Sequence, residues 1–215
     1  MIVIFSYNRP DMLLRLLNEC PTDERVVVID DGSRYEPTEH IKLCHYIRTQ
    51  HYGKEGFWRK WQHAFDLCRI SEDDYFTFLA DDMTDIRWER IARIPDKLYA
   101  QNLLTFKGRY SEWTGLGGQQ VVFNNEPHYS VGYVDCAYST NRATMDAISW
   151  TQDEVSWNWF KVGKHISSGV GHHQSWRFVH NKVPMYMPQV TIAKHGDHTS
   201  QMHPEHRKQV PLIVT

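Results

Sequence analysis

The sequence predicts an α/β fold in which helices flank a central, mostly parallel sheet within a single domain. In the first half of the chain, short apolar runs that favour strands alternate with segments of helical periodicity. Runs such as Arg25–Asp30 ("RVVVID") are almost continuously apolar, as strands buried on both faces of a parallel sheet are. The 215 residues, 41% of them apolar, suffice for one sizeable core.

Four strands are expected in the first half, and a helical segment follows each of the first three. The clearest helix begins near Pro10, which suits a first helical position, and its leucines repeat along one face. The segment between the second and third strands has a weaker helical pattern. The expected strands are Ile2–Ser6, Arg25–Asp30, His45–Thr49 and Tyr75–Ala80, and the expected helices are Arg9–Cys20, Thr38–Cys44 and Gly56–Cys68.

The second half is less regular, and we expect it to form a small subregion of the same domain. Several glycines between Leu103 and Phe123 indicate a loop-rich insertion or a hairpin. Strand and helix patterns then return. We expect a strand at Tyr133–Asn141, a helix at Arg142–Ser149, a loop-to-helix unit at Ser167–Lys182, and short strands within Val183–His195 that Pro188 interrupts. From Gly196 onward the chain is polar and rich in histidine.

The composition excludes several classes of protein. A net charge of -2 gives no global attraction to nucleic acid or to an anionic membrane, so a polyanion would need a local basic patch. No apolar run approaches the ~20 residues of a membrane-spanning helix, and the first residues lack the pattern of a signal peptide. The four cysteines form no C-x-x-C pair, which predicts reduced thiols in a cytoplasmic protein.

Polar and charged residues follow each of the four strands expected in the first half. Ligands of open parallel sheets gather beyond the carboxyl ends of the strands. Each of these segments alone is also typical of an ordinary turn or helix cap, but together they predict a nucleotide site. The residues are Ser6 at the end of the first strand with Tyr7 and Arg9 after it, Asp31 after the second, Gly53, Lys54 and Gly56 after the third, and Asp81 and Asp82 after the fourth.

The adjacent carboxylates of Asp81 and Asp82 would repel each other unless positive charge lies beside or between them. One interpretation is a polar turn that caps the following segment. The other is a divalent cation that also holds a phosphate, since Mg²⁺ and Mn²⁺ prefer carboxylate and phosphate oxygens.

The order "IVIFSYNRP", "VVVIDDGS", "HYGKEGFWRKWQHAF", "YFTFLADDM" resembles the nucleotide-sugar glycosyltransferases of the GT-A (Rossmann-like) fold, especially the family-2-like inverting enzymes. The resemblance implies a UDP-sugar donor, with a nucleotide-sugar-binding half at residues 1–102 and an acceptor-binding half at 103–215. It places Ser6, Tyr7 and Arg9 at the nucleotide, Asp31 at the base, Gly53, Lys54 and Arg59 near the base or diphosphate, Asp81 near the ribose, and Asp82 on Mn²⁺ or Mg²⁺. Ala80 departs from the family pattern, in which many relatives have a third acidic residue.

A further ligand is expected from the histidine-rich segment that follows the last strand. In many GT-A enzymes a late histidine completes the metal site, which implies this role for His195 and a diphosphate contact for Ser200 and Arg207. Two alternatives remain. One is a zinc site built from His195, His198, His203 and His206, although structural zinc sites made only of histidine are uncommon. The other is a solvated tail without a ligand.

Direct displacement of the sugar requires a group that takes the proton of the acceptor hydroxyl. Where relatives have acidic residues before a late helix, this chain has His172 and His173. The catalytic candidates are therefore His173, Asp153 and Glu154, with Asp135 as a further possibility. The alternative for Asp153 is a helix N-cap.

The acceptor is predicted less directly. The compact chain and its C-terminal segment resemble bacteriophage glycosyltransferases that modify DNA, which implies a hydroxymethylated pyrimidine as acceptor and a local basic groove. Seven residues could supply that groove: Arg59, Lys60, Arg87, Arg90, Arg93, Lys107 and Arg109. The alternatives are a bacterial surface glycan as acceptor, a nucleotidyltransferase, or a nucleotide- or carbohydrate-binding module without enzymatic activity.

Overall fold

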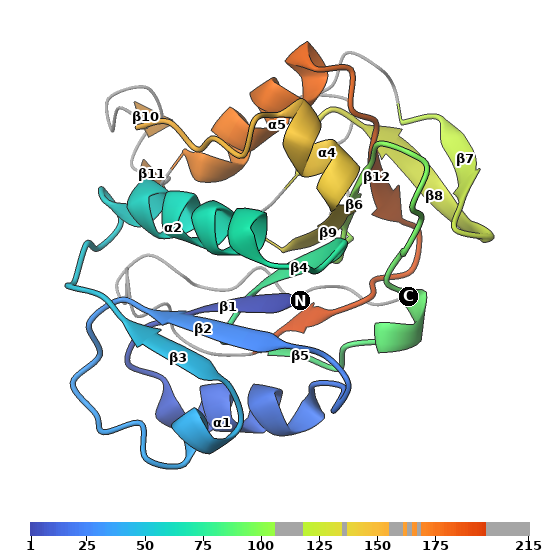
Figure 1. Ribbon diagram of the computed structural model, residues 1–215. Coiled ribbons are helices and arrows are strands. Elements are labelled where there is room, and N and C mark those ends of the chain that lie inside the picture. The colour runs from blue at the N-terminus through green and yellow to red at the C-terminus, as the bar shows by residue number, and fades with distance from the viewer. Residues whose placement is uncertain (106–117, 135–136, 155–160, 163–164, 167–168, 197–215) are drawn as a thin grey trace.

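The computed structural model describes residues 1–105, 118–134, 137–154, 161–162, 165–166 and 169–196 (Figure 1). Its central feature is a nine-stranded sheet in the order β3-β2-β1-β4-β9-β6-β12-β8-β7. The first four strands along the chain lie together at one side of this sheet and are mutually parallel. They are β1 (Ile2–Ser6), β2 (Val26–Asp30), β3 (His45–Arg48) and β4 (Tyr75–Ala80).

The other side of the sheet is mixed. β9 runs antiparallel between β4 and β6, β6 and β12 are parallel, and β8 connects β12 to the edge strand β7 by antiparallel pairing. β7 and β8 form a hairpin at the end of the glycine-containing region, and residues 106–117 of that region lie outside the described residues. These strands are β6 (Ala100–Asn102), β7 (Gln120–Phe123), β8 (Glu126–Val131), β9 (Tyr138–Asn141) and β12 (Met185–Pro188).

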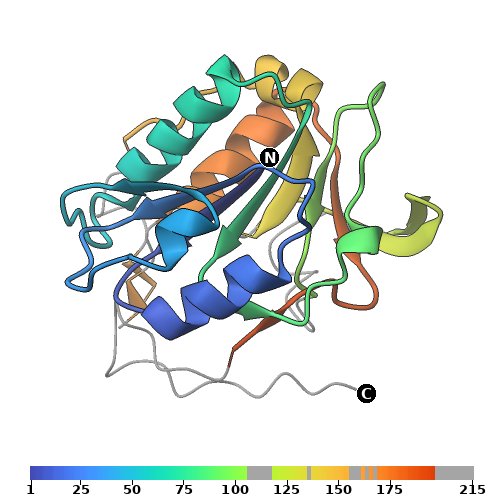
Figure 2. The ribbon, with the colours of Figure 1, turned by 60° about the horizontal axis from the view of Figure 1, so that its bottom comes forward.

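Helices cover both faces of the sheet. Among the described α-helices, α1 lies on one face and α2, α4 and α5 lie on the other (Figure 2). These helices span Pro10–Glu19, Phe57–Ile70, Arg142–Ala147 and Val170–His180, in that order. The segment expected as a weak helix at Thr38–Cys44 forms only a 3₁₀ turn at His40–Lys42, and a second 3₁₀ turn lies at Trp88–Arg90.

The strands alternate their side chains between two apolar cores. Ile2 and Ile4 of β1 pack with the leucines of α1, whereas Val3 and Phe5 pack with Trp61 of α2 on the opposite face. Side chains of a strand point alternately to the two faces of a sheet, so a strand covered on both faces must be apolar throughout. The predicted α/β fold, with a central sheet flanked by helices, is confirmed.

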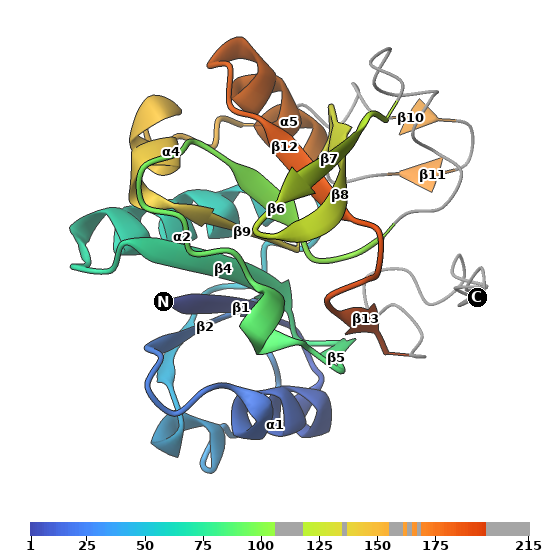
Figure 3. The ribbon, with the colours of Figure 1, turned by 90° about the vertical axis from the view of Figure 1, so that its right-hand side faces the viewer.

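Two small ladders lie outside the main sheet. β5 (Met83–Thr84) pairs with β13 (Lys194–His195), and β10 (Lys161–Val162) pairs with β11 (His165–Ile166). The first ladder brings the end of the described chain back to the residues that follow β4 (Figure 3).

Three of the four cysteines lie in the described part of the chain, and Cys20, Cys44 and Cys68 are free thiols there, as predicted. Burial raises the pKa of each of these thiols. Within the same residues, no helix is long and apolar enough to span a membrane.

Candidate active site

The loops after β1 and β4 meet where the strand order reverses. β1 lies between β2 and β4, and the chain places β2 and β3 on one side of β1 before it returns to the other side with β4. Open α/β sheets bind ligands in the crevice at such a switch point, outside the carboxyl ends of the strands. The backbone N–H of Asp81 donates to the carbonyl of Phe5 (3.0 Å), which keeps the two strand ends together.

Arg9 lies between the two adjacent carboxylates at this point. Its Nη1 atom is 2.8 Å from Asp81 Oδ1 and 2.8 Å from Asp82 Oδ2. Sequence reasoning required positive charge beside the pair, and Arg9 supplies it from the loop after β1. Both carboxylates and the guanidinium are largely buried, with side-chain exposures of 3%, 6% and 12%.

Asp81 accepts hydrogen bonds from the end of β1 and from the segment that follows it. Its Oδ2 accepts hydrogen bonds from the hydroxyl of Ser6 (2.8 Å) and from the backbone N–H of Tyr7 (3.1 Å). Burial raises the pKa of Asp81 to about 6, an effect that Arg9 opposes and that the charge of Asp82 reinforces. With both oxygens engaged, Asp81 fixes the conformation of the segment Ser6–Arg9, and its contact with a ribose stays a prediction.

Asp82 faces His195, as the pairing of β5 with β13 dictates. His195 lies opposite Met83 in this ladder, and its Nδ1 is 3.5 Å from Asp82 Oδ1. The backbone N–H of Gly196 donates to the carbonyl of Asp82 (2.7 Å). Segments more than 100 residues apart thus bring one carboxylate and one imidazole together.

These two side chains fit a divalent cation that is shared with a substrate. The Nδ1 atom of His195 is buried and makes no hydrogen bond to the residues that the structure describes. Mg²⁺ and Mn²⁺ are commonly held by one or two protein carboxylates together with substrate phosphates, and Mn²⁺ also accepts imidazole. Within the described ranges, no group of three or more histidine, cysteine or acidic side chains forms a metal cluster. Asp82 and His195 alone would therefore need oxygen atoms from a ligand.

Asp31 is buried beneath the loop between β3 and α2. Its oxygens accept hydrogen bonds from the backbone N–H groups of Tyr52 (2.8 Å) and Gly53 (3.2 Å). Lys60 Nζ, only 3% exposed, lies 3.2 Å from the same carboxylate. Asp31 thus positions this loop, and a direct contact with a base, which stays a prediction, would require the covering loop to move because the Asp31 side chain is fully buried.

Two glycines in these loops adopt positive φ angles that favour glycine over other residues. Gly53 has a φ of +59°, in the left-handed region that favours glycine. Gly32 has a φ of +71°, and a Cβ at this position would lie 2.8 Å from the backbone nitrogen of His51. A side chain at Gly32 would therefore push the two loops apart.

A pair of stacked rings joins the loop after β1 to the loop between β3 and α2. Tyr7 and His51 lie 4.5 Å apart between ring centroids and are nearly parallel at 16°. The Nδ1 of His51 is 3.0 Å from the carbonyl of Asp31. His51 was not among the predicted site residues, because a histidine in a glycine-containing loop has no sequence signature of its own.

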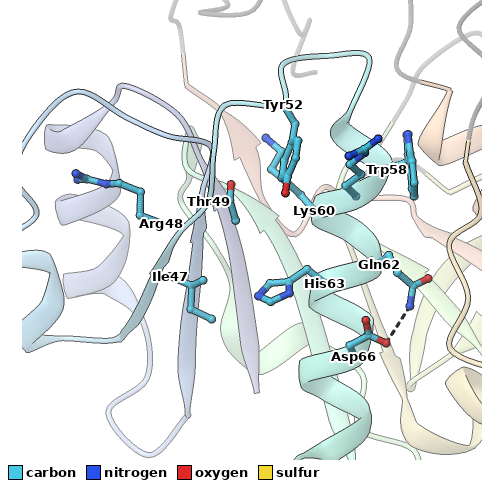
Figure 4. Close-up of a pocket in the computed structure, with 10 residues that line it drawn as sticks. Ile47, Arg48, Thr49, Tyr52, Trp58, Lys60, Gln62, His63 and Asp66 are labelled. Atoms are coloured by element: carbon cyan, nitrogen blue, oxygen red, sulfur yellow. Dashed lines mark hydrogen bonds between the residues drawn. The ribbon is translucent and has the colours of Figure 1, made fainter.

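The charged residues predicted between β3 and the start of α2 differ in exposure. Arg59 is exposed, with its guanidinium over the rings of Tyr52 (5.6 Å) and Trp58 (5.1 Å), and Lys54 is half-buried. A pocket of about 440 Å³ lies between β3 and α2 (Figure 4). In Figure 4, Tyr52, Lys60 and His63 border this pocket from the loop and the helix, and Thr49 borders it from the strand side.

Of the residues expected to form the basic groove, one is buried and two form ion pairs with acidic residues. Lys60 is buried against Asp31, Arg90 pairs with Glu126, and Arg93 pairs with Glu24. The prediction that Lys60 contributes to a nucleic-acid surface is wrong, because its position on α2 faces the sheet rather than solvent. Lys107 and Arg109 lie outside the described residues.

The catalytic candidates Asp153 and His173 contact each other. His173 Nε2 is 3.1 Å from Asp153 Oδ2, and Arg177 Nη2 donates to the same oxygen (2.6 Å). The Nδ1 of His173 lies 3.0 Å from Gln152 Nε2, a group that can only donate, so His173 carries its proton on Nε2. Gln62 of α2 accepts from the backbone N–H of Gln152 (2.7 Å) and anchors this segment.

These contacts give the two residues different chemistry. Burial lowers the pKa of His173, which favours the neutral ring. The hydrogen bond from Arg177, with a smaller contribution from His173, lowers the pKa of Asp153, which keeps its carboxylate ionised. Arg177 and His173 both contact Oδ2 of Asp153 and not Oδ1. Asp153 caps neither α4 nor α5, and the residues directly after Glu154 lie outside the described ranges, so the N-cap interpretation stays a prediction.

The remaining predicted residues are less informative. Glu154 is exposed, and His172 packs its ring against that of Tyr133 (5.2 Å). Ser200, Arg207, Asp135 and the three later histidines of the zinc alternative lie outside the described residues. Sequence reasoning missed Arg177, although its spacing of four residues after His173 could have placed both on one face of a helix.

Comparison with known proteins supports the fold. No protein-family model matches the chain, and no curated protein matches it. Among solved structures, it is similar to glucosyl-3-phosphoglycerate synthase from Mycobacterium tuberculosis in complex with phosphoglyceric acid. The identity is 12%, the match covers 92% of this chain and 71% of that chain, and the TM-score is 0.54.

A second match is the crystal structure of a mycobacterial protein, with 13% identity, coverage of 94% of this chain and 68% of that chain, and a TM-score of 0.52. At such identities the similarity shows the fold alone. The chain therefore has a GT-A-like α/β fold, and Arg9, Asp81 and Asp82 lie at its switch point.

Proposed function

We propose that this protein is a glycosyltransferase that moves a sugar from a nucleoside diphosphate sugar, expected to be a UDP-sugar, to a hydroxyl acceptor. The observation that carries the proposal is the convergence at the switch point. The loop after β1 supplies Arg9, the turn after β4 supplies Asp81 and Asp82, and β13 adds His195 beside Asp82. Carboxylates, a guanidinium and an imidazole at the strand ends suit a diphosphate and its cation.

Asp82 and His195 are the residues that would hold Mn²⁺ or Mg²⁺. When bound, the ion would stabilise the negative charge that develops on the diphosphate as the sugar leaves. Asp81 would keep the segment Ser6–Arg9 in place through its contacts with Ser6 and Tyr7. The stacked rings of Tyr7 and His51 provide a flat surface for a base or ribose beside this segment.

Asp153 is the proposed catalytic base. Its carboxylate stays ionised at neutral pH because Arg177 donates to Oδ2. His173 orients the same oxygen through Nε2, so Oδ1 is the atom that would accept the proton of the acceptor hydroxyl as that oxygen attacks the anomeric carbon. A single displacement of this kind inverts the configuration at that carbon.

The acceptor is proposed only as a hydroxyl compound. A DNA acceptor would need the local basic groove, and burial of Lys60 together with the ion pairs of Arg90 and Arg93 weakens that groove. The acceptor test therefore includes both hydroxymethylated DNA and a surface glycan.

The test is a nucleotide-release assay with purified protein and UDP-, GDP- and CMP-linked sugars, with Mn²⁺, with Mg²⁺ and with excess EDTA. We expect release of UDP that depends on the divalent ion and increases with the correct acceptor. Release of pyrophosphate from a nucleoside triphosphate would instead identify a nucleotidyltransferase. Absence of both release and binding of any nucleoside diphosphate sugar would reject enzymatic transfer at this site.

A further inference from the structure

Arg9 has a donor that its two carboxylate partners do not use. Nη1 contacts both Asp81 and Asp82, whereas Nε is buried and makes no hydrogen bond within the described part of the chain. A buried N–H without an acceptor is costly, and native proteins usually pair such groups with protein, water or ligand. Nε is thus a second donor on the same guanidinium, for which the described residues supply no acceptor.

The charge of Arg9 also opposes a divalent cation at Asp82. Arg9 occupies Oδ2 of this carboxylate, and the other oxygen, Oδ1, is the one that faces His195. A cation on Oδ1 and the guanidinium on Oδ2 would share one carboxylate within a buried site. Repulsion between charges at such short range is large when water is excluded, so the protein without nucleotide should hold the ion weakly.

A diphosphate resolves this conflict because it brings negative charge for both cations. Its oxygens can complete the coordination of the ion and accept hydrogen bonds from a guanidinium, which suits phosphate geometry. Resting on the proposed function, we propose that Arg9 is a counter-ion shared between the Asp81–Asp82 pair and the donor diphosphate, so that nucleotide and divalent cation bind cooperatively. Arg9 is in this sense a residue that determines selectivity for the metal–nucleotide complex over the metal alone.

Direct binding measurements test this without turnover. Mn²⁺ binding to the full chain is measured by electron paramagnetic resonance, first alone and then with saturating UDP, with GDP and CDP as further nucleotides. For the wild-type protein we expect UDP to tighten Mn²⁺ binding about tenfold or more. In Arg9→Gln, we expect Mn²⁺ alone to bind about tenfold more tightly than in wild type, since one opposing charge is gone, and the effect of UDP to shrink to less than about twofold.

Two further variants distinguish the effect of the Arg9 charge from the effect of a folding defect. Arg69→Gln removes an arginine charge from an exposed pair with Asp66 on α2 and should change neither quantity by more than about twofold. Arg9→Gln/Asp81→Asn restores the net charge of the site, so its affinity for Mn²⁺ alone should return to near the wild-type value while the response to UDP stays weak. Circular dichroism checks that each variant is folded.

The outcomes are distinguishable. In one outcome, the wild-type protein binds UDP and Mn²⁺ while Arg9→Gln and the double variant show the same Mn²⁺ affinity and the same response to UDP as wild type. That result refutes the shared counter-ion and leaves the proposed function standing. If Arg9→Gln tightens Mn²⁺ but UDP still couples normally, the diphosphate contact is refuted. If no nucleoside diphosphate binds to the wild-type protein with or without Mn²⁺, both proposals fall.

Discussion

Asp82 is the residue on which the proposed cation site depends, since its Oδ1 faces the imidazole of His195. We expect Asp82→Asn to lower kcat about 100-fold or more, because a bound ion contributes several kcal/mol to the stabilisation of the leaving diphosphate. His195→Ala should lower the affinity for Mn²⁺ with a smaller loss of kcat. Nucleotide release at saturating donor, over a range of Mn²⁺ concentrations, measures both.

Asp85→Asn is the matched control for this prediction. Asp85 lies three residues from Asp82, is exposed, and pairs at the surface with Lys194. Its substitution should leave turnover within about twofold of wild type. Turnover of well-folded Asp82→Asn close to that of Asp85→Asn would show that Asp82 holds no catalytic ion.

The lowered pKa of His173 predicts how the stability of the protein depends on pH. Burial lowers its pKa in the folded protein, so the unfolded chain takes up a proton near pH 6.5 while the folded protein resists it. The unfolded state therefore binds more protons below pH 6.5, and the contribution of this residue to stability is lost as pH falls through that value. Wild-type protein should thus lose more unfolding free energy between pH 7.5 and pH 5.5 than His173→Gln, as measured by urea titration.

An equal loss in both proteins would mean that His173 titrates normally in the folded state. The same variant tests whether it orients Asp153. His173→Gln should reduce kcat moderately and leave KM for the donor unchanged, whereas Asp153→Asn should reduce kcat much more, because only the latter removes the base itself.

At the scale of elements, the ion pair of Lys60 and Asp31 connects α2 to the end of β2. Both side chains are almost completely buried, and burial lowers the pKa of Lys60 although Asp31 opposes this. Breaking a buried pair from one side leaves a charge without its partner. We expect Lys60→Met to lower the free energy of unfolding by about 3 kcal/mol or more, as measured by urea denaturation.

The double variant Lys60→Met/Asp31→Asn should recover part of this loss, because no unpaired charge then remains in the core. Lys42→Met is the control for removal of a lysine from an exposed pair with Glu39 and should cost less than about 1 kcal/mol. Equal stability of Lys60→Met and wild type would mean that Asp31 is neutralised by other groups.

At the scale of the whole molecule, the proposed nucleotide and acceptor halves share one core. Val3 and Phe5 of β1 pack in the same apolar cluster as Phe178 of α5 and Met185 of β12. The sheet is also continuous from β3 to β7. We therefore expect a single unfolding transition in urea, with coincident midpoints for tryptophan fluorescence and far-ultraviolet circular dichroism. Separate midpoints would show that residues 1–102 and 103–215 unfold independently.

The sequence by itself determined the fold class and the location of the candidate site. Four apolar runs with polar residues directly after them specify a parallel arrangement, and parallel strands present their carboxyl ends at one edge. Periodicity was sufficient here because it reports which side chains are buried, as in β1 and β2, where both faces are covered. The same reasoning located Asp81 and Asp82 beside the loop that contains Arg9.

Only the tertiary structure decided what each of these residues contacts. The sequence does not show that Arg9 bridges both carboxylates, that Asp31 is buried under its own loop, or that Lys60 faces the core instead of solvent. Nor does it show that the pairing of β5 with β13 brings His195 within 3.5 Å of Asp82. Contacts of this kind join residues that are distant in the chain, and they depend on how strands and helices pack rather than on any local pattern.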